Sequence, residues 1–317
     1  MAQAETSIPT RGEVFPDGSF IELIRPDDSA PLRLLLWSGG EELVGEVLTY
    51  RGRQYKPGIV HDTILRALKL PSRAASFGSL RDLLAEVSKL VDQYVRLPEK
   101  HTALVGRFVL ATWLVDAMQS APRIRIEGCD TFRARQLLLL LTCICRRSLQ
   151  MTAVGPAAFC SLPSGFRFTL ILDQTDISDK FSSFLDAAIR RDSPILKRGE
   201  LLDLFGPQVI WRPDDRAWPP GSISIPCIPC GQKLPALDQA TQAEIVENFQ
   251  PKLLAFRFAY LAEARATNFD ASKFALPLKE LAVSFAAATP GSLICRRIFS
   301  GFCARKAMRW TPPIGWT

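Results

Sequence analysis

The pattern of hydrophobic and polar positions changes along the chain. Over residues 13 to about 60, short apolar runs are separated by turn residues: Phe20–Ile24 alternates, and Leu32–Trp37 stops at Ser38-Gly39-Gly40 before the run Leu43–Tyr50. Segments of this length with a period of two, bounded by glycine, proline and aspartate, are typical of strands. The pattern therefore predicts a small antiparallel β module.

From about residue 62 the apolar positions follow the period of a helix. Ser79 is a good N-cap for the amphipathic segment after it, and 99–118 predicts a second long helix. Short apolar runs then alternate with helical stretches. The predicted strands are 123–126, 149–154, 168–172 and 208–211, and the predicted helices between them are 133–147, 156–162 and 178–191. This alternation predicts an α/β fold with a mainly parallel sheet and helices on both faces.

The rest of the chain has a helical pattern, over 239–265, 272–288 and 292–310. We therefore expect three parts, with boundaries near residues 75 and 238. They are the β module with a short helix over 1–75, the α/β core over 76–238, and a helical C-terminal region over 239–317.

Composition and charge narrow the function classes without selecting one. The 317 residues are 47% hydrophobic and 22% charged, a composition that excludes a largely disordered or coiled-coil protein. Lys+Arg number 39 and Asp+Glu 32, a net charge of +7. This balance permits a nucleic acid or phosphate partner but does not require one.

No targeting signal is recognisable. The first residues lack a basic stretch followed by an apolar core, and the most apolar run, Leu137–Cys145, is about half of a membrane span. Several of the eight cysteines lie in apolar surroundings, where a free thiol behaves as a small hydrophobe. We therefore expect a cytoplasmic protein without a membrane partner.

Candidate chemistry lies where strands of the predicted parallel sheet end. The strand 123–126 runs into a turn at Gly128 and then a leucine-rich helix, and a later apolar strand ends in Asp173-Gln174. Ligands of α/β sheets bind at the carboxyl ends of the strands. P-loop NTPases have this layout: a strand, a loop and a helix, followed by a strand that ends in an acidic residue. Their motifs read GxxxxGK(S/T) and hhhhDE.

This stretch resembles the helicase-like P-loop ATPases, AAA+/RecA-like, that occur beside or fused to primases of phages and mobile elements. The resemblance covers roughly 95–290. Its matching parts are 122–128, Arg146-Arg147, 170–176, 205–210 and 252–258. It implies a P-loop NTPase-like core and, in ring-forming members, an arginine donated by a neighbouring subunit. The matching arginine-bearing strand, 220–226, carries no arginine here.

The departures from the family pattern are concentrated at the chemical positions. When the chain is aligned on Gly128, Thr131 and Arg133 occupy the positions of two loop glycines. Ala134 occupies the position of the phosphate lysine, Arg135 that of the Mg²⁺-binding hydroxyl, and Gln174 that of the catalytic glutamate. A side chain hinders the backbone approach that glycine allows, and glutamine cannot accept a proton as a carboxylate does. The resemblance therefore implies a fold that has lost ATP turnover.

Two alternatives remain open at this site. Arg133 and Arg135 near a helix N-terminus are suited to an anion, so a phosphate or nucleotide can be bound without hydrolysis. An unrelated α/β protein can also show the same strand–turn–helix layout. Under the kinship hypothesis we expect the Gly128 turn and the strand ending at Asp173 on adjacent strands of one sheet.

Two weaker signals lie nearer the C-terminus. Cys227 and Cys230 have the spacing of half a zinc site or of a redox pair, but no further ligands lie suitably, so we expect no metal. The predicted last helix is basic, and no acidic residue follows position 289. Its basic side chains are Arg296, Arg297, Arg305, Lys306 and Arg309. Such a helix is a candidate nucleic-acid contact.

The sequence is therefore interpreted as a catalytically degenerate P-loop ATPase-like protein, a scaffold or regulatory subunit without a cofactor, ATP and Mg²⁺ included. Its expected partner is another protein or an active paralogue, in a nucleic-acid-processing assembly. The alternatives are a nucleic-acid-binding protein that uses the basic C-terminal helix, and a protein with residual ATP binding or hydrolysis.

Overall fold

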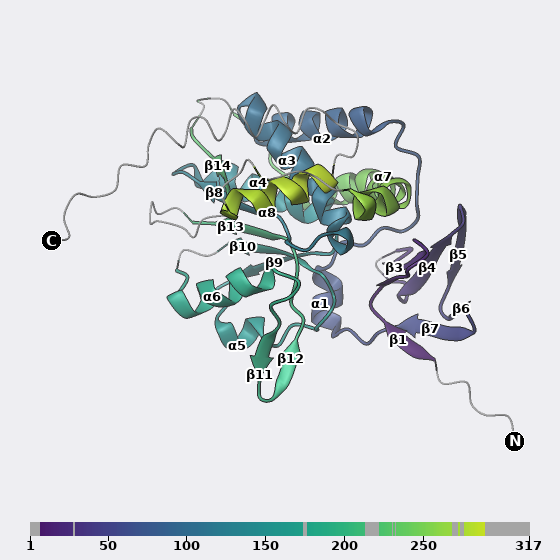
Figure 1. Cartoon of the computed structure of the whole chain (residues 1–317). Helices are drawn as coiled ribbons and strands as arrows, with labels where there is room; N and C mark the ends of the chain where they lie inside the picture. Colours follow the sequence, from purple (N-terminus) through teal and green to yellow (C-terminus); the bar gives the residue numbers. More distant parts are fainter. Residues whose placement is uncertain are drawn as a thin grey trace, which may run out of the picture.

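A five-stranded, all-parallel sheet forms the centre of the molecule (Figure 1). The computed structural model describes residues 7–27, 29–173, 176–212, 222–229, 231, 233–267, 272 and 276–288. The sheet order is β14-β8-β13-β10-β9, and the strands are β8 (Arg123–Glu127), β9 (Ser148–Thr152), β10 (Thr169–Asp173), β13 (Gln208–Trp211) and β14 (Ile223–Pro226). The predicted α/β class with a parallel sheet is confirmed.

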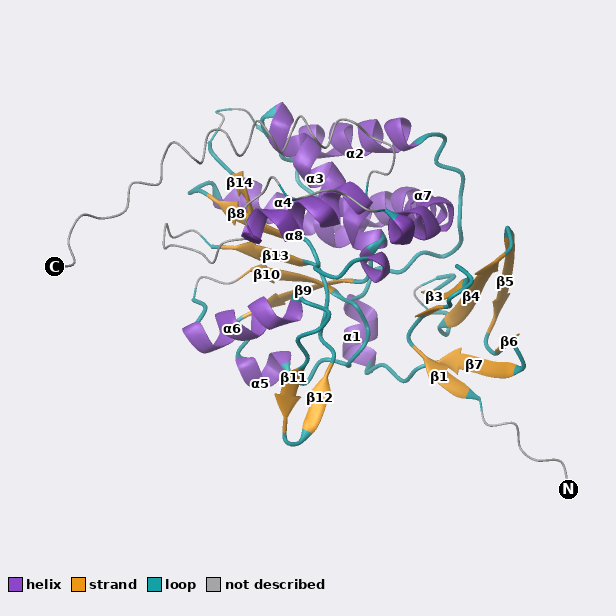
Figure 2. Cartoon of the chain, viewed as in Figure 1, coloured by secondary structure: helices purple, strands orange, loops and turns teal. Residues whose placement is uncertain are grey.

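Helices cover both faces of this sheet (Figure 2). The chain leaves β8 through α4 (Thr131–Ile144), reaches β9 at the far edge, and returns through α5 (Pro156–Phe159) and α6 (Asp179–Ala188). Because crossovers are right-handed, this reversal of direction puts α4 on the face opposite α5 and α6. With α4 lie α2 (Leu80–Tyr94), α3 (Glu99–Trp113), η1 (Val115–Ala117), α7 (Gln239–Ala266) and α8 (Leu276–Ala287).

Alternate side chains of each central strand enter different cores. In β10, Ile171 belongs to the cluster of α2, α3, α4 and α7, whereas Leu170 and Leu172 pack in the cluster of α5 and α6. A strand covered by helices on both faces therefore consists of consecutive apolar residues, and β10 has such a run in its sequence.

One expectation about the sheet is wrong. The Gly128 turn follows β8 and Asp173 ends β10, but β13 lies between these strands. From β9 at the edge of the sheet, the chain returns towards β8 one strand at a time. β10 comes first, and β13 then lies beside β8. Both segments still reach the same edge because all the strands are parallel, at about 10 Å for two strand spacings.

The N-terminal module contains two small sheets. Strands β2 (Glu13–Val14), β3 (Phe20–Ile24), β4 (Arg33–Ser38) and β5 (Glu41–Gly45) form one, and β1 (Ile8–Thr10), β7 (Arg53–Pro57) and β6 (Leu48–Tyr50) form the other. The pair β1–β7 is parallel, unlike the antiparallel pairing expected. Helix α1 (Asp62–Ala67) follows. A hairpin of β11 (Ile195–Lys197) and β12 (Glu200–Leu202), which the sequence pattern did not predict, extends from the core.

Strand β3 attaches the module to the core. All five of its residues are buried: Phe20 packs towards α7, and Ile21 and Leu23 belong to the opposite cluster. The rings of Trp37 and Phe258 stack with centroids 4.5 Å apart. Because β3 is buried on both sides, the module packs closely against one end of the core (Figure 1).

A buried group of charges joins the same two parts, and we call it the arginine cluster. It consists of the carboxylates of Glu22 and Asp116 with the guanidinium groups of Arg146, Arg147, Arg167 and Arg257. Burial raises the pKa of Glu22, but the neighbouring arginines outweigh this effect and lower the pKa to about 2. The pair Arg146-Arg147, part of the family resemblance, therefore binds Glu22 inside the protein.

Among the described residues, no helix has both the length and the apolar character that a membrane crossing requires. The boundaries predicted near residues 75 and 238, and a cytoplasmic location, stay predictions.

Candidate functional site

The candidate site is the carboxyl edge of the sheet, where β8 turns into α4. The turn is only three residues long, because β8 ends at Glu127 and α4 begins at Thr131. Positions 131–135, which the resemblance assigns to the end of a phosphate loop, are therefore helical. A loop that wraps a phosphate with successive backbone N–H groups needs more extended chain than this turn provides.

Gly128 allows the loop after β14 to approach the turn. Its φ is +112°, and a Cβ there would lie 2.3 Å from the carbonyl oxygen of Cys227. The Cys227 N–H donates to the Glu127 carbonyl at 2.7 Å, and the Asp130 N–H donates to the Cys227 carbonyl at 3.4 Å. The glycine therefore serves close packing between two loops of the same chain.

Arg133 fills the space beside this turn. Its Nε donates to the carbonyl of Val95 at 2.7 Å, Nη1 donates to the carbonyl of Ile228, and Nη2 donates to the carbonyl of Arg96. The residue is buried. All three nitrogens of the guanidinium group thus donate hydrogen bonds to backbone carbonyls. These carbonyls belong to the end of α2 and to the segment after β14.

The N-terminus of α4 also binds an internal anion. The Asp130 carboxylate accepts from the backbone N–H of Arg133 at 3.0 Å as the N-cap of the helix. A carboxylate is favoured at a helix N-terminus by the unpaired N–H groups and the helix dipole. Asp130 therefore takes the position at which an external anion would interact with this helix.

Arg135 lies on the opposite, exposed side of α4. Its guanidinium carbon is 5.9 Å from the centroid of the Trp211 ring, at the end of β13. Trp211 is in register with Asp173 on β10, so the contact between Arg135 and Trp211 involves the strand next to the second candidate segment. Asp173 is partly buried at the end of its strand.

The remaining predicted site residues are distributed differently. Thr131 is the exposed first residue of α4, and Ala134 is fully buried in the core. A lysine at position 134 would place its charge among leucines, not at a phosphate. Gln174 lies outside the described residues. So do Arg296, Arg297, Arg305, Lys306 and Arg309.

The cysteine pair has only one described member. Cys227 is buried, and burial raises the pKa of its thiol to about 12. Such a thiol stays protonated and is a poor nucleophile or metal ligand. Cys230 lies outside the described residues, and within those residues no group of three or more His, Cys, Asp or Glu is placed to hold a metal ion.

Sequence reasoning did not find the residues that close this edge. Asp130 has an N-cap signal, an aspartate just before a helix, that could have been recognised. The carbonyls of Val95, Arg96 and Ile228 carry no side-chain signal. Trp211 was read only as the last residue of an apolar strand.

Comparisons with known proteins add only a distant likeness. No family model matches the chain, and no curated protein matches it. Solved structures of the NrS-1 C-terminal region are similar to it. An apo structure in the A form gives a TM-score of 0.41 with 10% identity, covering 89% of this chain and 72% of that chain. A further apo structure gives 0.36 with 11% identity, over 86% and 73%. Likeness at this level carries no argument about function.

Proposed function

We propose that this protein is a non-hydrolysing, P-loop-ATPase-like scaffold or regulatory subunit in a nucleic-acid-processing assembly; its two candidate segments share one edge of the sheet, although β13 separates their strands. One observation carries the proposal: the sheet edge at which α/β proteins bind ligands is filled by the chain's own groups. Arg133, bonded to three backbone carbonyls, is the central one.

Most of the groups that ATP turnover needs are replaced. Phosphate binding needs an extended loop and a lysine, but the turn has three residues and Ala134 faces the core. The helix N-terminus, which favours phosphate, is capped by the Asp130 carboxylate. Only Asp173 at the end of β10 matches a metal-binding position of the family pattern.

ATP hydrolysis by the full chain, with Mg²⁺, tests this proposal. We expect phosphate release at the background rate, unchanged in Asp173→Ala and in the matched control Asp179→Ala, an exposed residue at the start of α6. Hydrolysis above background that is lost in Asp173→Ala and kept in Asp179→Ala would overturn it. Titration with a fluorescent ATP analogue tests binding separately, and we expect none.

Exposed apolar side chains beside the closed turn support a protein partner. Phe132 is 48% exposed and Ile228 is 62% exposed, and they flank Arg133 on either side of the turn. With a purified active paralogue, we expect Phe132→Asp to weaken binding by about tenfold or more, the effect of desolvating a charge at an apolar contact. Leu43→Asp, on the distant β5, is the matched control and should have no effect.

Nucleic-acid binding is the second candidate, favoured by the β11–β12 hairpin. Figure 1 shows this hairpin projecting from the core. Arg198 is exposed at its tip, where a guanidinium can contact a phosphate. The basic segment 292–310 lies outside the described residues and belongs to the same hypothesis.

Salt dependence separates this candidate from the first. If the five basic residues of segment 292–310 contact the backbone of a single-stranded oligonucleotide, affinity should fall about a hundredfold between 50 and 200 mM salt. Fluorescence anisotropy of the full chain and of Arg198→Ala measures this. Absence of binding at about 50 mM salt would remove the candidate, since electrostatic affinity is greatest at low salt.

A further inference from the structure

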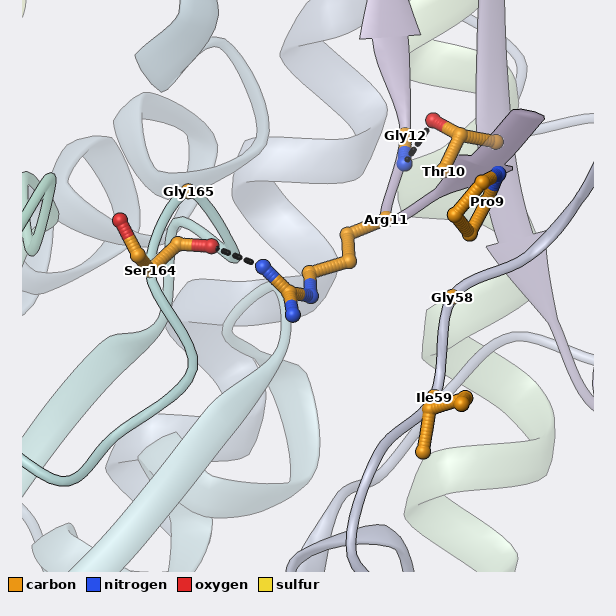
Figure 3. A pocket seen from close by; sticks show the side chains of 8 residues that line it. All are labelled: Pro9, Thr10, Arg11, Gly12, Gly58, Ile59, Ser164 and Gly165. Atoms are coloured by element: carbon orange, nitrogen blue, oxygen red, sulfur yellow. Dashed lines mark hydrogen bonds between the residues drawn. The ribbon is translucent and has the colours of Figure 1, made fainter.

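A cavity of about 480 Å³ opens between the N-terminal module and the core, and we call it the seam pocket (Figure 3). The module side contributes the end of β1 and the segment after β7, and the core side contributes the loop before β10. The lining residues used below are Pro9, Arg11, Gly12, Ile59, Ser164 and Gly165. Its size falls within the range of small-molecule sites.

Arg11 bridges the two walls of the seam pocket. Its Nη1 donates to the carbonyl of Ser164, and Figure 3 shows the guanidinium between the Ser164–Gly165 loop and the Gly58–Ile59 segment. The Nε of Arg11 is buried and has no hydrogen-bond partner among the described residues. A buried donor without an acceptor is costly, so Arg11 gains a hydrogen bond when its side chain shifts and presents Nε to an acceptor in the pocket.

The wall behind Gly12 is positively charged. The φ of Gly12 is +112°, and a Cβ there would lie 2.5 Å from Nη2 of Arg147, so only glycine lets the turn between β1 and β2 lie against the arginine cluster. Arg146 and Arg147 both pair with Glu22, so their cations lie close together. Burial, and after it the neighbouring Arg146, lowers the pKa of Arg147 to about 10.

Acidic groups cancel most but not all of this charge. The arginine cluster contains four guanidinium groups and two carboxylates, and Asp203, which pairs with Arg167, is a third, so one positive charge remains. Asp203, whose backbone packs on Ser164 and Gly165, directs its own carboxylate to Arg167 and to the N–H of Phe205. The potential in the seam pocket therefore favours an anion.

We propose that the seam pocket binds a small organic oxyanion, a carboxylate or a phosphate monoester, through Arg11. A guanidinium matches the geometry of an oxyanion with two parallel N–H groups and is suited to sites with little water. The apolar rim, formed by Pro9 and by Ile59 at 90% exposure, suits the organic part of the ligand. This site is separate from the sheet edge, so its failure and that of the proposed function are distinguishable.

Phenyl phosphate and benzoate are the probes, because they share a ring and differ in the oxyanion. Isothermal titration of the full chain with each probe identifies which oxyanion is preferred. Saturable binding of at least one probe is expected, and Arg11→Gln should abolish it. Arg53→Gln, which removes an exposed arginine of β7, is the matched control and should leave the affinity unchanged.

Ile59 provides a test that does not depend on the walls of the pocket. Because its side chain is 90% exposed, neither Ile59→Glu nor Ile59→Gln should affect folding. A negative charge at the rim should weaken the affinity for either oxyanion about tenfold, whereas the isosteric glutamine should change it by less than about threefold.

Two results would overturn the proposal. One is that neither probe binds the wild-type chain at a probe concentration of about 10 mM, which is above the millimolar Kd of a simple site. The other is binding that is equally strong in Arg11→Gln and Ile59→Glu, which would place the anion elsewhere on this basic protein.

Discussion

Two arginines in one helix show how position decides the role of a residue. Arg133 and Arg135 are separated by about 200° around α4, because each helical residue turns the chain by about 100°. Arg133 therefore enters the protein and bonds three carbonyls, whereas Arg135 stays exposed beside Trp211. In sequence they were a candidate anion-binding pair, and in space they lie on different sides of the helix.

The first prediction concerns this difference. Arg133→Ala leaves three carbonyls at a buried position without their donor, at about 1–3 kcal/mol for each unsatisfied group, so we expect a loss of about 3 kcal/mol or more. Arg135→Ala removes an exposed contact with an aromatic ring and should cost about 1 kcal/mol or less. Urea unfolding measures both. Equal losses would show that Arg133 does not have the structural role described.

At the scale of elements, the edge of the sheet is closed by two loops of one chain. The turn between β8 and α4 and the segment after β14 meet at Gly128 and Cys227, and Arg133 adds the end of α2. This closing is possible because β14 lies directly beside β8 with its carboxyl end at the same edge. A strand order with β14 elsewhere would leave the turn open.

A glycine substitution tests the contact between these loops. Gly128→Ala combines an unfavourable positive φ with a Cβ 2.3 Å from the Cys227 oxygen, so we expect a loss of about 3 kcal/mol or more. In the matched control Gly52→Ala, φ is +71° and no other atom lies within 4 Å of the added Cβ. Its cost should be about 1 kcal/mol, the conformational part alone. A similar Tm for the two variants in calorimetry would contradict the close packing.

At the scale of the whole molecule, the arginine cluster holds the β module against the core. Glu22 of β3 bonds Arg146 and Arg147 after α4, and it also lies 3.2 Å from Arg257 of α7. A buried carboxylate that neutralises several guanidinium groups matters most when it is removed, since the cations then remain buried without compensation. The cluster therefore specifies how the two parts fit together.

Glu22→Gln tests this role through stability and pH. We expect a loss of about 3–5 kcal/mol, against about 0–1 kcal/mol for Glu86→Gln, which breaks a surface pair with Lys252. The pKa of Glu22 is lowered from 4.5 to about 2, so its contribution is present above pH 4.5 and is lost as the pH falls towards 2.

Urea unfolding between pH 3 and 6 measures this dependence. The wild-type chain should lose stability on acidification below pH 4.5, because the unfolded state then binds a proton that the folded state does not. Glu22→Gln should lose less over the same interval. An identical pH dependence in both proteins would exclude Glu22 as a source of the acid sensitivity.

The sequence by itself determined the elements of the core and their type. The apolar runs at 123–126 and 208–211 correspond to β8 and β13, and Ser79 does cap α2, with Asp82 completing the capping box. It also determined that Gly128 and Asp173 share an edge of one sheet. These properties follow from local periodicity, caps and the parallel alternation of strands and helices, which each short segment carries in itself.

Only the tertiary structure decided the strand order, the burial of Arg133 and the composition of the arginine cluster. The partners of Arg133 are backbone carbonyls 37, 38 and 95 residues away, which no side-chain pattern reveals. Glu22 read as the polar position of an alternating strand, and its burial depends on cations more than 120 residues later. Long-range contacts depend on how the layers stack, because the free energy of a charge or donor is set by what surrounds it after folding.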